Sequence, residues 1–135
     1  MTAGTRWARA SPWLLAALLA GAGVLHFVAP QPYLRIIPKA LPEPELLVAA
    51  SGVVELACAG LVAHPRTRRL GGWAAAALFV VVFPANVQMA LDAGRGPAWY
   101  QAVAWARLPL QVPLVWWGVA VARQAGRAVE RRTNR

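Results

Sequence analysis

The 135-residue sequence is poor in cysteine and in acidic residues. Its single cysteine, Cys58, excludes an internal disulfide, a Cys-x-x-Cys redox pair and any metal or iron–sulfur site built from several cysteines. Only 5 residues are Asp or Glu, and charged residues make up 14% of the chain, against about 25% in an average soluble domain. The hydrophobic share of 59% exceeds the usual value of about 45–50%, which excludes intrinsic disorder and disfavours a soluble globule.

The few charges that are present are mostly positive. The 14 Lys and Arg residues produce a net charge of +9. A charge of this size can indicate nucleic-acid binding, which places basic residues on a polar folded face. Here the Arg residues form short clusters between apolar blocks. We therefore expect no nucleic-acid partner.

Four apolar blocks dominate the chain, at residues 13–29, 45–64, 70–91 and 101–122. Each is as long as the roughly 17–25 residues that a membrane-spanning helix requires. The blocks lack the alternation of barrel strands and the charged stripe of helices in soluble bundles. The sequence therefore predicts one all-α domain over residues 1–135, an integral membrane four-helix bundle.

The connectors between the blocks differ in character. Residues 65–69 form a short link, which predicts an antiparallel hairpin of the second and third helices. Residues 30–44 contain five prolines, which preclude a continuous helix, and their apolar side chains are expected to lie in the interface or to cap the bundle. Residues 92–97 are a Gly/Pro turn.

The distribution of basic residues predicts the orientation. With four helices, both termini and the connector 65–69 lie on one side. Three basic residues, Arg35, Lys39 and Arg95, fall on the other side. The positive-inside rule then predicts a multi-pass plasma-membrane protein with both termini in the cytoplasm and a basic tail, residues 123–135, against anionic lipid. The Arg residues expected on the cytoplasmic side are Arg6, Arg9, Arg66, Arg68, Arg69, Arg123, Arg127, Arg131, Arg132 and Arg135.

The N-terminal segment also has features of a secretory signal peptide. Two Arg residues precede an apolar run that ends in small residues around 20–23. Cleavage there would leave three helices. We expect the segment to be retained, because His26 lies just beyond and belongs to the predicted fold.

Every apolar block contains a polar side chain. His26 lies in the first block, Glu55 in the second, Asn86 in the third, and Arg107 and Gln111 in the fourth. A charged residue at the centre of a spanning helix costs about 2.5–3.5 kcal/mol on insertion scales, so it requires a partner or a wet cavity. The residues one turn away from His26 and Glu55 are small, which favours close helix packing and an inward orientation. We therefore predict that these five residues form one polar cluster.

Each of these residues has a structural and a functional interpretation. Glu55 and Arg107 would form a buried ion pair that either sets the helix register or serves a proton or ligand site. His26 would either form a hydrogen bond at the end of its helix or contact a ligand. Asn86 would either satisfy the carbonyls that Pro84 frees or contact a substrate. A metal site is not expected, because the predicted cluster contains only one His and one carboxylate, which are too few ligands.

The polar residues belong to an ordered series of motifs. The series is Gly23-Val24-Leu25-His26-Phe27, Ile37-Pro38, Leu41-Pro42, Ser51-Gly52-Val53-Val54-Glu55, Phe83-Pro84-Ala85-Asn86 with Met89, and Arg107-Leu108-Pro109-Leu110-Gln111. Over residues 21–117 it resembles the DoxX-like family of small bacterial membrane proteins. The resemblance implies a four-helix membrane bundle and places all five polar residues at motif positions of that family.

The resemblance also implies a redox context. The family takes its name from a membrane subunit of an archaeal thiosulfate:quinone oxidoreductase, and other relatives are linked to oxidative-stress complexes. Some broader relatives use cysteine pairs for thiol redox chemistry, which a chain with one cysteine cannot perform. The sequence has no flavin, haem or iron–sulfur motif. We therefore expect no intrinsic cofactor and no catalysis by the chain alone.

Three functions are compatible with these observations. The first is a non-catalytic subunit of a membrane oxidoreductase complex, which binds a small lipophilic molecule such as quinone or docks a redox enzyme; Arg107, Asn86 and Gln111 would donate to a ligand oxygen, and Glu55 would orient Arg107. The second is a homo-oligomeric proton-coupled transporter in which Glu55 carries the proton and Arg107 is its counter-ion. The third is a scaffold whose ion pair stabilises the fold.

Overall fold

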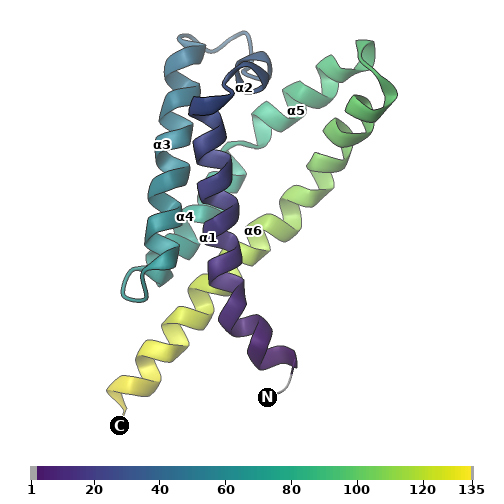
Figure 1. The fold of residues 1–135 in the computed structure, drawn as a ribbon. Coiled ribbons are helices and arrows are strands. Elements are labelled where there is room, and N and C mark those ends of the chain that lie inside the picture. The colour runs from purple at the N-terminus through teal and green to yellow at the C-terminus, as the bar shows by residue number, and fades with distance from the viewer. Residues whose placement is uncertain (1–2, 135) are drawn as a thin grey trace.

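The computed structural model describes residues 3–134, which form helices joined by short turns and contain no strand. The helices are α1 (Ala3–Val28), α2 (Gln31–Arg35), α3 (Pro44–Ala63), α4 (Arg68–Val81), α5 (Phe83–Asp92) and α6 (Ala98–Thr133), with a 3₁₀ turn η1 (Ala93–Arg95) between α5 and α6 (Figure 1). The all-α prediction is confirmed for this part of the chain.

Several helix ends differ from the predicted ones. α1 begins at Ala3 instead of residue 13, and α6 continues to Thr133, so most of the predicted basic tail is helical. The third predicted helix is interrupted at Val82, where α4 ends and α5 begins. Pro84 explains the interruption, because it has no N–H to donate to the preceding turn. The prolines inside α6, Pro109 and Pro113, do not end that helix.

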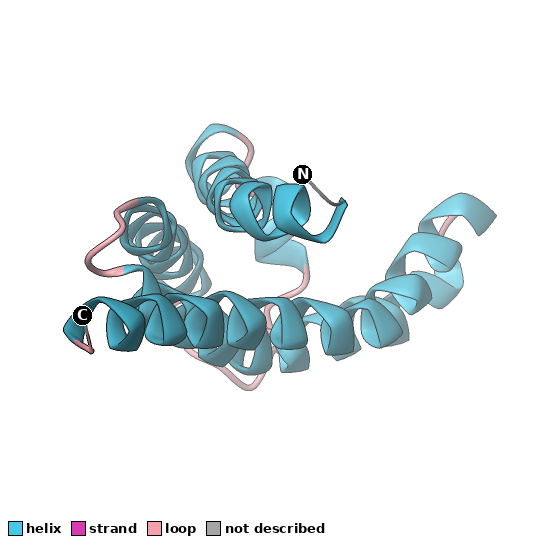
Figure 2. Cartoon of the chain, turned by 90° about the horizontal axis from the view of Figure 1, so that it is seen from below, coloured by secondary structure: helices cyan, strands magenta, loops and turns pink. Residues whose placement is uncertain are grey.

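The helices pack as two pairs that cross each other. α1 packs along α3, α4 packs along α6, and contacts of α3 with α4 join the two pairs. α1 and α6 cross and contact each other at Ser11 and Trp117. At this crossing Trp117 Nε1 donates to Ser11 Oγ at 2.8 Å, and the Trp7 ring stacks on the Trp117 ring. Away from this crossing the two helices diverge (Figures 1 and 2). Residues of both helices line two separate cavities, one toward each end of the molecule.

Adjacent glycines let α4 approach both neighbouring helices. A Cβ added to Gly71 would lie 2.5 Å from the backbone nitrogen of Val62 in α3. A Cβ added to Gly72 would lie 2.6 Å from the backbone nitrogen of Ala122 in α6. Only residues without a side chain permit helix backbones to pack this closely. Cys58 is buried in the apolar core formed by α1, α3, α4 and α6.

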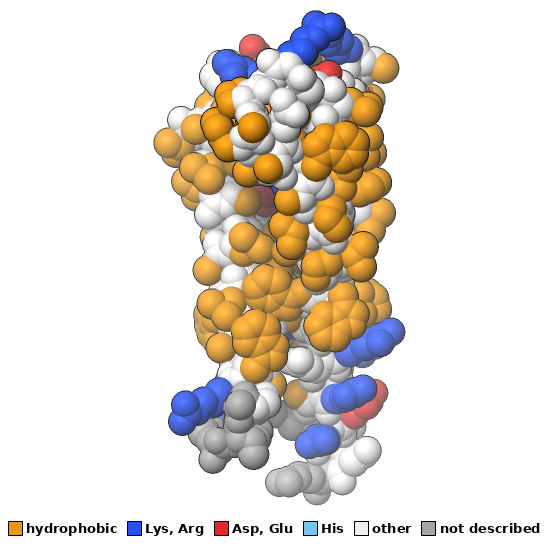
Figure 3. Space-filling model, turned by 90° about the vertical axis from the view of Figure 1, so that its right-hand side faces the viewer, with side chains coloured by type: hydrophobic (Ala, Val, Ile, Leu, Met, Phe, Trp, Pro, Cys, Tyr) orange, Lys and Arg blue, Asp and Glu red, His pale blue; other side chains and the backbone are white. Residues whose placement is uncertain are grey.

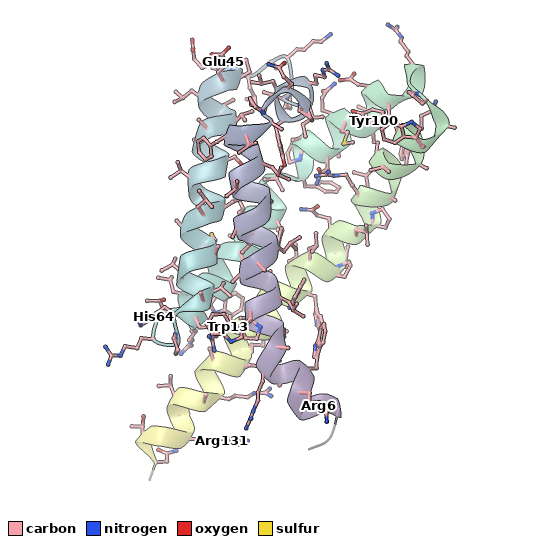
Figure 4. The ribbon with its side chains drawn as sticks, viewed as in Figure 1. Arg6, Trp13, Glu45, His64, Tyr100 and Arg131 are labelled. Atoms are coloured by element: carbon pink, nitrogen blue, oxygen red, sulfur yellow. The ribbon has the colours of Figure 1, made fainter. Side chains whose placement is uncertain are left out.

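The described ends of α1 and α6 lie at the same end of the molecule as the turn between α3 and α4. Figure 4 shows Arg6, His64 and Arg131 at this end, called here the lower end, and Glu45 and Tyr100 at the upper end.

Three helical stretches are long and apolar enough to cross a membrane: Arg6–Val28, Pro44–Ala63 and Arg68–Arg95. They correspond to the first three predicted spans. α6, the predicted fourth, is not among them, because Arg107, Gln111 and two prolines lower its mean hydropathy. Apolar side chains cover the middle of the face in Figure 3, between basic groups at the two ends.

Candidate functional site

A cavity of about 270 Å³ lies between the two helix pairs in the upper half of the molecule. α2 and the loop that follows it close the cavity from above, and α1, α3, α5 and α6 supply its walls. Its lining is mostly apolar, from residues such as Ile36, Val48 and Val81. The polar residues that line it are His26, Tyr33, Ser51, Glu55, Asn86 and Arg107. Four of the five predicted site residues therefore meet at one cavity.

The first polar wall is built by His26 of α1 and Glu55 of α3. The backbones of these helices approach closely because residue 52 is glycine: a Cβ there would lie 2.8 Å from the Cβ of His26. His26 Nδ1 lies 2.8 Å from the Ala22 carbonyl and 3.2 Å from Glu55 Oε2. A carbonyl only accepts, so the Nδ1 hydrogen points to Ala22. The two residues are 7% and 12% exposed, and Glu55 Oε2 has no hydrogen-bond donor among the described residues.

Tyr33 of α2 covers this wall. Its ring stacks on His26 with 3.8 Å between the ring centroids and an angle of 28° between the planes. Burial raises the pKa of the Tyr33 hydroxyl above 10.0, the negative charge of Glu55 raises it further, and Arg107 acts in the opposite direction. Tyr33 therefore stays neutral at physiological pH and presents a hydroxyl that can donate or accept.

The second polar wall is a chain of three hydrogen-bonded side chains, called here the amide relay. Arg107 Nε donates to Asn86 Oδ1 at 3.2 Å, and Asn86 Nδ2 donates to Gln111 Oε1 at 2.9 Å. Gln111 Nε2 donates to the carbonyl of Phe79. Phe79 belongs to the last turn of α4, directly before the break at Val82. The relay thus connects the helix break to the guanidinium of Arg107.

The predicted ion pair between Glu55 and Arg107 is wrong for this structure. The side chain that lies within 4.0 Å of the Glu55 carboxylate is that of His26, and Arg107 bonds to Asn86. The physical reason is the division into two helix pairs: Glu55 and Arg107 belong to different pairs, and the cavity separates them. Asn86 was predicted to satisfy a carbonyl that Pro84 frees, but its Nδ2 donates to Gln111 Oε1, and it is Gln111 that donates to a backbone carbonyl, that of Phe79.

Two lining residues were missed by the sequence analysis. Ser51 lies four positions before Glu55, so helical spacing alone would have placed it on the same face. Tyr33 belongs to the connector whose apolar side chains were expected to lie in the interface or to cap the bundle, and no spacing rule connects it to His26.

The two polar walls differ in the groups that they offer. Arg107 carries N–H groups beyond the Nε used for Asn86, so its wall can donate hydrogen bonds. The wall of His26 and Glu55 offers a carboxylate, which accepts them. Within residues 3–134, no group of three His, Cys, Asp or Glu side chains could hold a metal ion. The arrangement suits a ligand with polar atoms on an otherwise apolar body.

The cavity continues toward the gap between α1 and α6. A second space of about 250 Å³ shares Tyr33, Ile36 and Arg107 with it and is bounded by Leu25 of α1 and Tyr100 of α6. Figure 3, which faces this gap, shows acidic and basic side-chain atoms at the floor of a hollow in an apolar surface. The polar walls are therefore reached from the side of the molecule, between α1 and α6.

Comparison with known proteins finds one family. A family model described as a domain of unknown function (DUF8561) matches residues 15–122. No curated protein and no solved structure matches the chain. The matched range contains every residue of both polar walls, and the resemblance to the DoxX-like family stays a prediction.

Proposed function

The chain belongs to the DUF8561 family, and we propose from the geometry of its cavity that it is a membrane subunit that binds a small lipophilic molecule with a polar head group. One observation carries the proposal: polar side chains from α1, α2, α3, α5 and α6 converge on a cavity whose remaining lining is apolar. Ligand sites have this composition, with few polar groups placed in an apolar pocket to fix the orientation of the ligand.

In this proposal α6 is the fourth span of a multi-pass bundle in the plasma membrane. Of the polar residues that lower its mean hydropathy, Gln111 is buried, and Arg107 bonds to Asn86 while staying exposed at the opening between α1 and α6. The opposite surface of α6 is apolar, with Val112 and Trp116 exposed by 72% and 69%. A helix that turns its polar side toward a cavity can cross a bilayer despite modest overall hydropathy.

Charge supports a cytoplasmic location for both termini. The lower end carries Arg6, Arg9, Arg66, Arg68, Arg69, Arg123, Arg127 and Arg131. The side chain of Arg132 and the whole of Arg135, which the sequence analysis also counted, lie outside the described residues. The other connectors contribute only Arg35, Lys39 and Arg95. Basic residues accumulate on the cytoplasmic side of membrane proteins.

The size and access of the cavity restrict the ligand. Sites for drug-sized molecules measure about 300–1,000 Å³, so a cavity of about 270 Å³ suits a single ring-sized head group. The opening between α1 and α6 faces the lipid, so a tail attached to that head group can stay in the bilayer. A quinone has this form: its ring oxygens would accept from Arg107 on one wall and contact Tyr33 and His26 on the other.

The amide relay changes the roles expected for its members. Asn86 and Gln111 use their amide groups within the relay, so they are positioning residues that hold Arg107 at the cavity. Arg107 is the residue that contacts the ligand. Glu55, expected to orient Arg107, instead faces it across the cavity. The DoxX-like resemblance supports quinone as the ligand and a redox enzyme as the partner, and the chain itself supplies no catalysis.

The test is an analysis of the molecules that the protein retains. The protein is purified in mild detergent from a quinone-producing host, and bound molecules are identified by mass spectrometry and absorbance. We expect stoichiometric quinone in the wild type, its loss in Arg107→Gln, and its retention in Arg95→Gln, a matched change at the same end but outside the cavity. A wild type that carries only bulk lipid and binds no added short-chain quinone would contradict the proposal.

A second candidate, proton-coupled transport, is favoured by the contact of His26 with Glu55. Two groups that can carry a proton lie 3.2 Å apart at the cavity. In this candidate Glu55 loads and releases the proton, and a second copy of the chain completes the pathway. Proton flux into liposomes that Glu55→Gln abolishes would support it, and equal flux from wild type and variant would exclude it. A pure scaffold predicts neither ligand nor flux.

A further inference from the structure

A basic cleft lies at the lower end, on the other side of the crossing of α1 and α6 from the polar cavity. It has a volume of about 460 Å³ and forms where the two helices diverge below the contact of Trp117 with Ser11. Four of its lining residues are arginines from three helices: Arg9 of α1, Arg68 of α4, and Arg127 and Arg131 of α6.

The positive charge of this cleft is not neutralised by the described part of the chain. None of the four arginines lies within ion-pair distance of a described carboxylate. The one acidic residue at the lower end, Glu130, does not line the cleft; it lines a neighbouring depression with Arg69, Arg123 and Arg127, without an ion pair to any of them. Like charges that converge without a counter-charge repel each other, so a cleft of this kind favours an anion.

One arginine is held in place without an anion. Arg68 Nε donates to the Val62 carbonyl at 2.8 Å, and its Nη2 donates to the Ala63 carbonyl at 2.9 Å. Its guanidinium also lies over the Trp13 ring, 5.5 Å from the centroid. These contacts satisfy the last carbonyls of α3 and fix a positive charge at the back of the cleft. An anion would therefore meet a preformed charge.

Apart from Gln124, the rest of the lining is apolar and small. Ala8, Pro12, Val121, Ala125 and Ala128 form most of the remaining surface of the cleft. Exposed aromatic rings surround the lower end of α1, where Trp7 and Trp13 are both 57% exposed. Tryptophan favours the boundary between the hydrocarbon and the head groups of a bilayer. The cleft therefore lies at head-group level and joins apolar helix surfaces along which acyl chains can pack.

We propose that this cleft binds the phosphate of one anionic phospholipid. Arg9, Arg127 and Arg131 surround the phosphate, Arg68 supplies the fixed charge behind it, and the acyl chains follow the outer surfaces of α1 and α6. Arginine suits this role because its planar guanidinium bonds two phosphate oxygens at once. The site is independent of the polar cavity, and its ligand holds the diverging ends of the two helices together.

The experiment measures lipid binding to the full-length protein by native mass spectrometry in detergent. Phosphatidylglycerol, phosphatidylcholine and inorganic phosphate are added in separate titrations. The wild type should retain one phosphatidylglycerol with at least about tenfold preference over phosphatidylcholine. Inorganic phosphate should neither bind nor displace the lipid at matched concentrations. Displacement of the lipid by inorganic phosphate would assign the cleft to a free anion and overturn the proposal.

Variants separate the cleft from general surface charge. Arg9→Gln with Arg127→Gln removes two charges from the cleft, and Arg66→Gln with Arg123→Gln removes two from the same end outside it. The first pair should weaken phosphatidylglycerol binding about tenfold or more, and the second should leave it within about twofold. Equal losses would overturn the proposal. The single variants Arg9→Gln and Arg131→Gln, each expected to weaken binding about threefold, apply the same test if the double variant does not fold.

Discussion

Replacing Gln111 by Leu tests the connection between the helix break and the candidate ligand site. Gln111 Nε2 donates to the Phe79 carbonyl, and its Oε1 accepts from Asn86 Nδ2. Leu can make neither bond. The substitution therefore leaves one acceptor and one donor without partners in the buried interface of α4, α5 and α6.

The expected loss of stability follows from these two groups. A buried polar group without a partner costs about 1–3 kcal/mol in soluble proteins, whereas hydrogen bonds between membrane helices contribute about 0.6 kcal/mol on average and about 1.7 kcal/mol at most. Losing two hydrogen bonds lowers the free energy of unfolding, and burying the Leu side chain offsets part of this loss. We expect a net decrease of about 1–3 kcal/mol. Ligand binding should also weaken, because Arg107 loses the fixed orientation of Asn86. Re-ordering one side chain costs about 0.5–1.5 kcal/mol, which corresponds to roughly 2- to 12-fold in Kd.

The matched control is Gln88→Leu in α5. Gln88 Nε2 donates to Asp92 Oδ2 at 2.8 Å on the exposed side of the helix, so this change should cost less than about 0.5 kcal/mol. Circular dichroism follows the unfolding of both variants, which are kept in mild detergent throughout. Both variants are also titrated with the short-chain quinone to measure its Kd. If Gln111→Leu is as stable as Gln88→Leu and binds quinone equally well, the relay has no role and the reasoning is refuted.

Three other predictions concern single positions. Gly72→Ala should lower the stability by about 1–3 kcal/mol, because the added Cβ would meet the backbone nitrogen of Ala122. Gly21→Ala should raise the stability by about 0.5–1 kcal/mol, because a Cβ at residue 21 has nothing within 4 Å. Thermal unfolding of the two variants measures both changes. Burial raises the pKa of Tyr33, so the folded state keeps the hydroxyl proton to a higher pH than the unfolded state does. The free energy of unfolding should therefore fall as the pH rises above about 10. In melting curves taken above this pH, a Tyr33→Phe variant should lose less stability than the wild type. Cys58 is buried, so it should react with a maleimide only after unfolding, and rapid labelling of the native protein would contradict its place in the core.

The general position of the site could be predicted from the sequence because membrane helices tolerate polar residues only under strict conditions. A group such as Glu55 or Arg107 must avoid lipid, so it turns toward the other helices. His26, Glu55, Asn86 and Arg107 accordingly meet at one cavity, and Gln111 lies next to it. The prediction required only the identity of these residues and their depth along each apolar block.

The partners of these residues could not be predicted in the same way. Depth along a helix does not specify which helices lie next to each other. The two glycines of α4 bring it against both α3 and α6, and Gly52 brings α3 against α1. The resulting pairs place Glu55 beside His26 and Arg107 beside Asn86, with the cavity between them. Tyr33 became part of the site only because α2 folds back over His26.

The sequence by itself determined the helical class, the positions of three candidate spans and the polar residues within the apolar blocks, because each depends on composition along a single segment. Only the tertiary structure decided which polar residues bond, where the cavity opens and that a second, basic cleft lies beyond the helix crossing. These features depend on the close approach of backbones at a few glycines and on the divergence of α1 and α6 from their contact at Ser11 and Trp117. Both are relations between distant segments, which no local pattern in the chain expresses.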